Sequence, residues 1–181
     1  MKHLFSSFVL LFSCLSAEWP SFDLSIGSGV QFERSHCTPY GRTEGGIGWK
    51  GFFAQYQSDV GNRLWNQRAT LSYDFSLLCF HLLPSAGWNR FECHSVTFAG
   101  PFVGADAAIC LGPISLSAGY RYTFDGHADG QIGIATLGWS ILPLLSLYVE
   151  GEGRFFNEIP FNAFHHHWNS YNLTVGARFN F

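Results

Sequence analysis

Charged residues are scarce in this chain. They make up 13% of its 181 residues, against roughly 25% in typical soluble domains. Ten Lys and Arg residues stand against 13 Asp and Glu residues, and this net charge of −3 is not that of a basic nucleic-acid-binding protein. No apolar stretch beyond the N-terminal region reaches the roughly 20 residues that a membrane-spanning helix needs. We therefore expect neither a nucleic-acid partner nor a helical membrane domain.

Residues 1–17 have the pattern of a secretory signal peptide. A basic start is followed by an apolar run over residues 4–15 and by the small residue Ala17. We predict cleavage after Ala17, which leaves residues 18–181 as the mature domain with nine basic and 13 acidic residues, a net charge of −4. The alternative is a lipoprotein signal with Cys14 as the modified residue, but the preceding Leu11-Phe12-Ser13 fits poorly, because small residues are expected beside such a cysteine.

In contrast to charged residues, aromatic residues and glycines are abundant in this chain. The chain is 18% aromatic and has 20 glycines. An exported, apolar and charge-poor chain without a membrane helix has the composition of a membrane β-barrel, because closed barrels and helices are the two structures that satisfy their backbone groups inside lipid.

Alternation with a period of two, the mark of a strand with two different faces, runs through the mature chain. It is clearest where apolar residues occupy every second position from Tyr171 to Phe181. The segment 43–56 turns irregular in its second half, which suggests a β-bulge. Eight strands are predicted, over residues 22–33, 43–56, 63–78, 99–111, 114–125, 131–142, 144–156 and 171–181. We therefore predict an all-β fold, an eight-stranded antiparallel up-and-down transmembrane β-barrel.

The predicted connections differ in length. Those after the second, fourth and sixth strands are short, and those after the other strands are mostly longer, namely 34–42, 79–98, 126–130 and 157–168. Outer-membrane barrels have short periplasmic turns and longer extracellular loops. We therefore predict that both chain ends face the periplasm and that the longer loops face outside.

The alternation also fits a water-soluble, lipocalin-like barrel, whose apolar face would line the cavity. Here the apolar face carries almost no charge and many large side chains, which would not fit a small interior. We therefore expect the opposite, charged face to line the lumen.

The final predicted strand is typical of a known family of barrels. Its alternate positions are occupied by Tyr171, Leu173, Val175, Ala177, Phe179 and Phe181. With the signal peptide, the eight strands and the loop asymmetry, residues 18–181 resemble the small OmpA/OmpX-type outer-membrane β-barrels. The resemblance implies the outer membrane of a Gram-negative bacterium, contact with its lipid, and recognition of Phe181 by the barrel-assembly machinery. It implies no particular activity.

The interior of an eight-stranded barrel is just filled by side chains. Charges there must be paired because desolvation is costly. We therefore expect a charge network that fills the lumen, with a narrow gated channel as the alternative. The predicted network consists of Glu44, Lys50, Arg68, Asp74, Asp106, Arg121, Glu150, Glu152, Arg154 and Arg178.

All seven histidines of the mature chain map to the predicted outer loops. Three of them are consecutive, His165, His166 and His167, and histidine is the commonest metal ligand. They are candidates for binding a metal or haem. The alternative is that they are ordinary polar loop residues, because three consecutive strand residues point to alternating sides and no zinc-site spacing is present. We predict no cofactor.

The mature cysteines are Cys37, Cys79, Cys93 and Cys110. Export favours oxidation, and a disulfide needs Cα atoms within about 7 Å. The predicted topology puts Cys110 at the periplasmic rim, away from the other three. One outer bond is expected, with Cys79–Cys93 favoured over Cys37–Cys93. The remaining outer cysteine could then cross-link to envelope proteins.

Some barrels of this kind are enzymes, and the lipid A deacylase family uses a His-x-Ser-Asn motif. The corresponding residues 154–157 here lack both catalytic types, and His167 and Ser170 have the wrong spacing. Without a nucleophile paired with a base, the sequence favours a structural or surface-interaction barrel. A deacylase-like enzyme, a narrow channel and a metal- or haem-binding surface protein are the alternatives.

Overall fold

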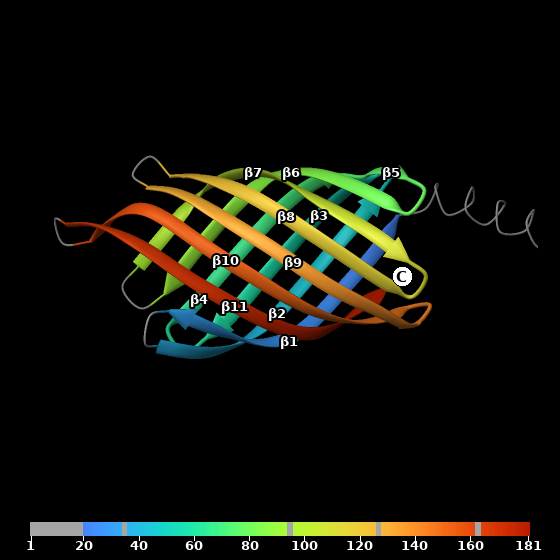
Figure 1. Cartoon of the computed structure of the whole chain (residues 1–181), viewed down its shortest axis with the longest axis horizontal. Helices are drawn as coiled ribbons and strands as arrows, with labels where there is room; N and C mark the ends of the chain where they lie inside the picture. Colours follow the sequence, from blue (N-terminus) through green and yellow to red (C-terminus); the bar gives the residue numbers. More distant parts are fainter. Residues whose placement is uncertain (1–19, 34–35, 94–95, 126–127, 162–163) are drawn as a thin grey trace, which may run out of the picture.

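The structure is a computed structural model that describes residues 20–33, 36–93, 96–125, 128–161 and 164–181. Figure 1 shows one closed barrel of antiparallel strands. None of the described residues forms a helix long and apolar enough to cross a membrane.

The strands follow one another along the chain with short connections. Their bounds are β1 (Ser21–Glu33), β2 (His36–Trp49), β3 (Phe52–Gly61), β4 (Leu64–Tyr73), β5 (Phe75–Leu77), β6 (Phe80–Cys93), β7 (Val96–Leu111), β8 (Ile114–Asp125), β9 (Ala128–Leu142), β10 (Leu145–Phe161) and β11 (Phe164–Asn180).

Two pairings close the sheet into a barrel. β1 pairs with β11 from Asp23–Asn180 to Phe32–Tyr171, and β4 pairs with β6, while the short β5 pairs only with the start of β6. The barrel wall therefore has ten strands. Ser21 and Phe181 lie at one end, which we call the terminal end, and the opposite end is called the far end.

The predicted count of eight strands is wrong, and two regions explain it. Residues 43–56 are not one bulged strand: they contain the hairpin of β2 and β3, which turns at Lys50 and Gly51. Both turn residues have positive φ, 50° and 84°, the backbone of a two-residue type I′ turn. The predicted loop 79–98 contains β6 and the first residues of β7.

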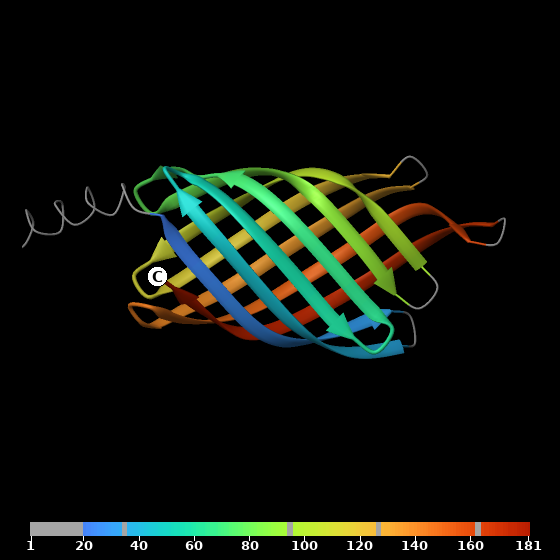
Figure 2. The same ribbon diagram turned by 180° about the vertical axis from the view of Figure 1, so that it is seen from behind.

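The predicted asymmetry of loop lengths is also wrong. At the far end, two residues stand between successive strands at 34–35, 62–63, 94–95, 126–127 and 162–163. The segments expected to be outer loops are mainly extensions of the strands. Figures 1 and 2 show that the β10–β11 hairpin reaches furthest beyond the rest of the barrel.

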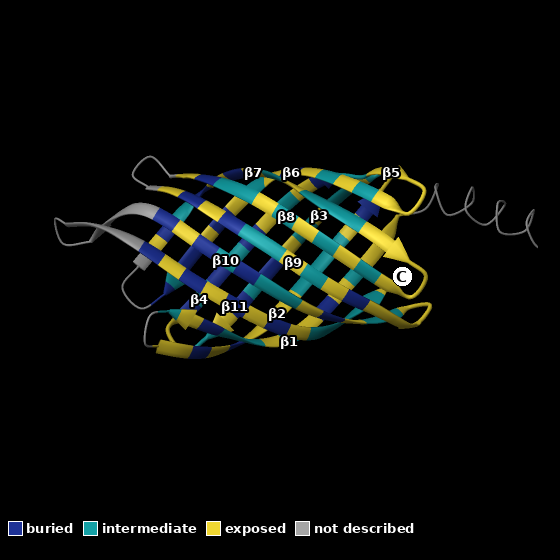
Figure 3. Cartoon of the chain, viewed as in Figure 1, coloured by how far each residue is buried: buried dark blue, intermediate teal, exposed yellow. Residues whose placement is uncertain are grey.

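The two faces of the wall differ in polarity. On β11, the outward side chains of Tyr171, Leu173 and Val175 are 50–55% exposed, whereas the inward Asn172 and Thr174 are buried. Figure 3 shows the buried residues concentrated toward the far end. Large exposed apolar side chains occur on the outward face of each wall strand, so the barrel has the lipid-facing arrangement of a membrane protein, not the apolar cavity of a soluble one.

Val175 tests this assignment, since it lies midway along the outward row from Tyr171 to Phe179 on β11. We expect Val175→Arg to lower the free energy of unfolding by about 2–4 kcal/mol, because it places a guanidinium in the middle of the hydrocarbon. Guanidinium chloride titration of the protein in lipid vesicles, followed by tryptophan fluorescence, measures the change.

The matched control is Leu78→Arg. Leu78 lies in the turn between β5 and β6 and is 94% exposed, so the change should stay within about 0.5 kcal/mol. Equal, small effects at both positions would contradict a lipid-facing wall.

Candidate functional site

The lumen contains three successive groups of side chains. The aromatic layer, nearest the far end, is the buried cluster of Tyr40, Leu64, Phe91, Cys93, Phe98, Phe156 and Trp168. The charge cluster, next to it, is Arg42, Asp59, Arg68, Glu150, Glu152 and Arg154. The lumen pocket lies toward the terminal end.

The charge cluster is built by cross-strand register. Arg42 and Asp59 are direct partners across β2 and β3, while Glu150, Glu152 and Arg154 occupy alternate positions of β10. Alternate positions of a strand share a face, so all five side chains enter the lumen. The cluster thus joins strands that lie far apart in the sequence.

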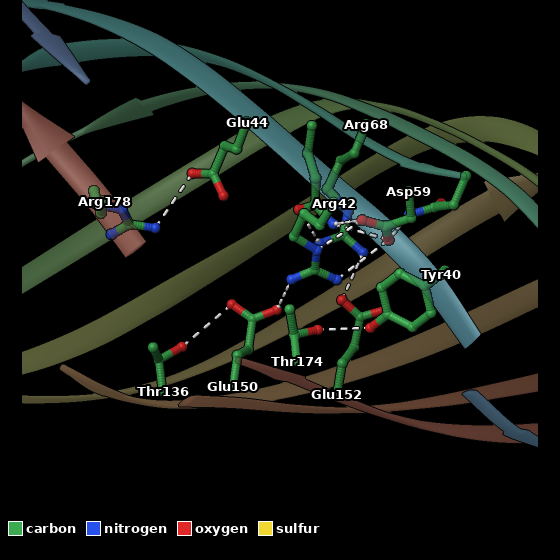
Figure 4. A network of polar contacts seen from close by, with 12 residues as sticks. Tyr40, Arg42, Glu44, Asp59, Arg68, Thr136, Glu150, Glu152, Thr174 and Arg178 are labelled. Carbon is green, nitrogen blue, oxygen red and sulfur yellow. Dashed lines mark hydrogen bonds and ion pairs between the residues drawn. The ribbon is translucent and has the colours of Figure 1, made fainter. Parts of the chain in front are cut away.

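Three arginines and three carboxylates balance one another (Figure 4). Arg42 Nε donates to Asp59 Oδ1 at 2.7 Å, and its Nη1 donates to Glu150. On the other side of the cluster, Arg68 Nη2 lies 3.0 Å from Glu152 Oε2, and Arg154 donates to the same Glu152. Because the numbers of positive and negative groups are equal, the cluster as a whole is neutral.

Asp59 is the residue on which most of these contacts converge. Besides its bond with Arg42, its carboxylate accepts from Asn66 Nδ2 at 2.9 Å and from Gln57 Nε2 at 3.1 Å, and Arg154 Nη2 lies 3.6 Å away. The side chain is 1% exposed. A carboxylate buried so deeply needs these partners, because an unpaired buried charge is strongly destabilising.

The aromatic layer fills the lumen on the far side of this cluster. The ring of Phe91 lies 4.9 Å from that of Trp168, and the ring of Phe98 lies 4.8 Å from that of Phe156, measured between centroids. The guanidinium of Arg154 stacks 4.7 Å above the Phe91 ring, which is within the range of a cation–π contact. The two groups are therefore packed against each other.

The lumen pocket is a cavity of about 220 Å³ with charged walls. Arg121 lies 3.2 Å from Asp106, and Arg178 lies 3.4 Å from Glu44. The guanidinium Nε and Nη1 of Arg121 have no hydrogen-bond partner among the described residues. The pocket is large enough for several water molecules or a small ligand.

The structure places eight of the ten residues of the predicted charge network in the charge cluster or along the lumen pocket. Lys50 instead lies in the β2–β3 turn, where its Nζ stacks 4.7 Å above the Trp49 ring. Asp74 pairs with His81 at 3.0 Å near the terminal end. Sequence reasoning missed Arg42 and Asp59, which it assigned to connections between strands.

The expectation that every mature histidine lies at the outer end is wrong for His81. This residue is the second of β6, near the terminal end. His36 begins β2 at the far end and is exposed. The side chains of His165, His166 and His167 lie outside the described residues, so metal or haem binding there stays a prediction. Within the described part of the chain, no three potential ligands are grouped as a metal site requires.

The favoured disulfide partners are not brought together. Cys79 directly precedes the 14-residue β6 and Cys93 ends it, so the two lie roughly 45 Å apart at the rise of a strand. Cys93 is buried in the aromatic layer, where its Sγ accepts from Gln31 at 3.2 Å. Cys110, expected to be remote from the other three, lies beside Cys79: its amide donates to the Cys79 carbonyl at 2.8 Å.

The deacylase-like alternative would use Ser170 and His167. Ser170 is buried, and its hydroxyl has no partner among the described residues, while the side chain of His167 lies outside them. Phe181 continues the β1–β11 ladder through two hydrogen bonds with Phe22, and its reading by the assembly machinery stays a prediction.

Replacing Asp59 tests the charge cluster. We expect Asp59→Asn to lower the free energy of unfolding by about 3–5 kcal/mol, because the amide keeps the shape but leaves Arg42 and Arg154 without their shared carboxylate. Chemical unfolding from lipid vesicles measures it.

Glu92→Gln is the control. Glu92 lies 2.6 Å from Arg90 in an ion pair whose side chains are 34% and 47% exposed, and its loss should cost no more than about 1 kcal/mol. An Asp59→Asn effect as small as this one would show that the charge cluster does not stabilise the barrel.

Comparison with known proteins shows which solved structures have a similar fold. No protein-family model and no curated protein sequence matches the chain. Among solved structures, it is similar to the outer-membrane protease OmpT of Escherichia coli, with a TM-score of 0.53 and 11% identity over 90% of this chain and 96% of that one. It is also similar to the KdgM porin, with a TM-score of 0.50 and 11% identity over 87% and 99% of the two chains.

At this level of identity the likeness shows the fold alone. The neighbours are small outer-membrane barrels and do not single out the OmpA/OmpX type, whose eight strands this barrel does not share. The lipid-facing wall and these likenesses together make the chain an integral β-barrel protein of the cell outer membrane.

Proposed function

We propose that this protein is a structural barrel of the outer membrane that does not conduct and that offers its far end for interactions at the cell surface. The observation that carries the proposal is the filled lumen: the aromatic layer and the charge cluster occupy successive levels of the same interior.

The charge cluster is suited to closing a lumen and poorly suited to conducting. Arg42 and Arg154 are fully buried, and Asp59 and Glu152 are 1–2% exposed. An ion entering this level would have to break short charge-assisted bonds, which are the strong ones in proteins. The charge cluster also has no excess of either charge, whereas channels select ions with rings of side chains of one charge sign.

The aromatic layer adds a second barrier. Phe91, Phe98 and Phe156 are at most 1% exposed, and their rings lie in contact. Hydrated ions do not pass a packed apolar layer, because they would have to lose their water there. Passage would require both levels to rearrange.

A narrow channel is the second candidate, and the lumen pocket favours it. The pocket is a polar cavity of about 220 Å³ on the terminal side of the charge cluster, and the similar KdgM barrel is a porin. In this chain the polar space is followed toward the far end by the charge cluster and the aromatic layer, so we rank the channel below the closed barrel.

The far end supports the surface-interaction part of the proposal. The β10–β11 hairpin extends beyond the neighbouring strands (Figure 1), and its two strands are paired up to Phe161 and Phe164. Outer-membrane lipid around the wall and the assembly machinery at Phe181 remain the other proposed partners.

Planar-bilayer recording tests the closed lumen. We expect the purified, folded protein to give no stepwise currents, because both levels of the lumen block hydrated ions. The KdgM porin in the same chamber shows that channels are detected, and heat-modifiable gel migration shows that the sample is folded. Regular, ohmic current steps from the folded protein would contradict the proposal and favour the channel.

A further inference from the structure

We propose that Cys79 and Cys110 form a disulfide bond that ties β6 to β7 at the terminal end of the barrel. This inference does not depend on the closed lumen.

The register of the two strands carries the argument. β6 and β7 pair as far as Phe80 and Ile109, so one further step sets Cys79 opposite Cys110. The hydrogen bond from the Cys110 amide to the Cys79 carbonyl, 2.8 Å long, shows that this step is made. Cα atoms of residues paired in this way lie about 5.5 Å apart, which is the usual separation across a disulfide.

Both thiols are accessible. Cys79 and Cys110 are exposed, and Cys79 follows Leu78 in the two-residue turn between β5 and β6. The backbone pairing is already in place, so a small closing movement of the two strand ends, with rotation of both side chains, brings the sulfurs together. Either side of the outer membrane lies outside the reducing cytosol.

Among the residues that the structure describes, the fold leaves the other two cysteines out of reach of Cys79. Cys37 and Cys93 lie at the far end, on β2 and at the end of β6. Cys37 is exposed while Cys93 is buried in the aromatic layer. The structure therefore selects one partner for Cys79.

The chemistry is thiol–disulfide exchange with a disulfide-bearing oxidoreductase of the envelope. The thiolate of one cysteine attacks the oxidoreductase disulfide, forms a mixed disulfide and expels one thiolate of the oxidoreductase. The thiolate of the second cysteine then attacks the sulfur of the first and expels the other. Cys79 and Cys110 together lose two protons and two electrons, and the oxidoreductase leaves as a dithiol.

The bond would reinforce a section of the wall where the pairing on one side is short. β4 pairs with β6 only from Ser72–Ser85 onward, so the first residues of β6 have only the three-residue β5 on that side. On the other side they pair with β7. A covalent link between Cys79 and Cys110 would fix this section to β7.

Peptide mapping of the folded protein from outer-membrane fractions tests the proposal. The sample is alkylated with N-ethylmaleimide during unfolding without reductant, and is then cut after Arg and before Asp. Cleavage at Asp74, Arg90, Asp106 and Arg121 puts Cys79 in residues 74–90 and Cys110 in residues 106–121, while Cys93 falls in residues 91–105. The expected result is that most of peptide 74–90 is linked to peptide 106–121 and is released by reductant.

Two variants serve as controls, each checked for folding by heat-modifiable migration. Cys110→Ser should abolish the linked species and leave Cys79 alkylated, and Cys37→Ser should leave the link unchanged. Recovery of peptides 74–90 and 106–121 from the wild-type protein with both cysteines alkylated, or of Cys79 linked to Cys37 or Cys93, would overturn the proposal.

Discussion

The closure of the sheet is the constraint on which the rest of this structure depends. Inside lipid each backbone amide and carbonyl must be bonded within the protein, so the strands must close into a barrel without an edge. The pairings β1–β11 and β4–β6 provide that closure with ten strands. The number of strands sets the width of the lumen, and the width sets how many side chains must fill it.

The lumen is filled in part by polar and charged side chains, which cannot lie on the outward, lipid-facing side of the wall. Arg42, Asp59 and Glu150 meet in the lumen although they come from strands at different ends of the sequence. Burying such charges is costly even when they are paired, so we interpret the cluster as a device that fixes the arrangement of the wall strands more than as a large net source of stability. The aromatic layer beside it supplies the apolar burial that charges cannot.

Much of this architecture could be predicted from residues whose alternation is regular. The outward row of β11 and the inward positions of Arg121, Glu152 and Arg178 follow from strict period-two patterns. The predicted number of strands is wrong because the alternation of inward and outward residues shifts by one position at the β2–β3 turn. Before Lys50 the even-numbered residues face the lumen, and after Gly51 the odd-numbered residues do. A two-residue hairpin turn produces this change. The sequence pattern alone suggests a β-bulge at the same place.

The charge cluster could be predicted only in part, for the same reason. Arg42 and Asp59 fell in predicted connections, so the residue on which the cluster converges was absent from the expected network. β6 was hidden by Pro84, which is unusual in a strand interior, and by inward aromatic residues such as Phe91 that break the polar pattern. Pairing of Cys79 with Cys110 could not be seen because Cys79 was placed at the wrong end of the molecule.

Amide hydrogen exchange across residues 80–93, measured by NMR on the protein in lipid nanodiscs, tests the ten-stranded closure most directly. The account predicts that the amides of Gly87 and Asn89, which β4 and β7 flank, exchange as slowly as those in the middle of β11, because they are bonded inside the membrane. Exchange of this whole segment at the rate of an exposed loop would contradict the ten-stranded barrel.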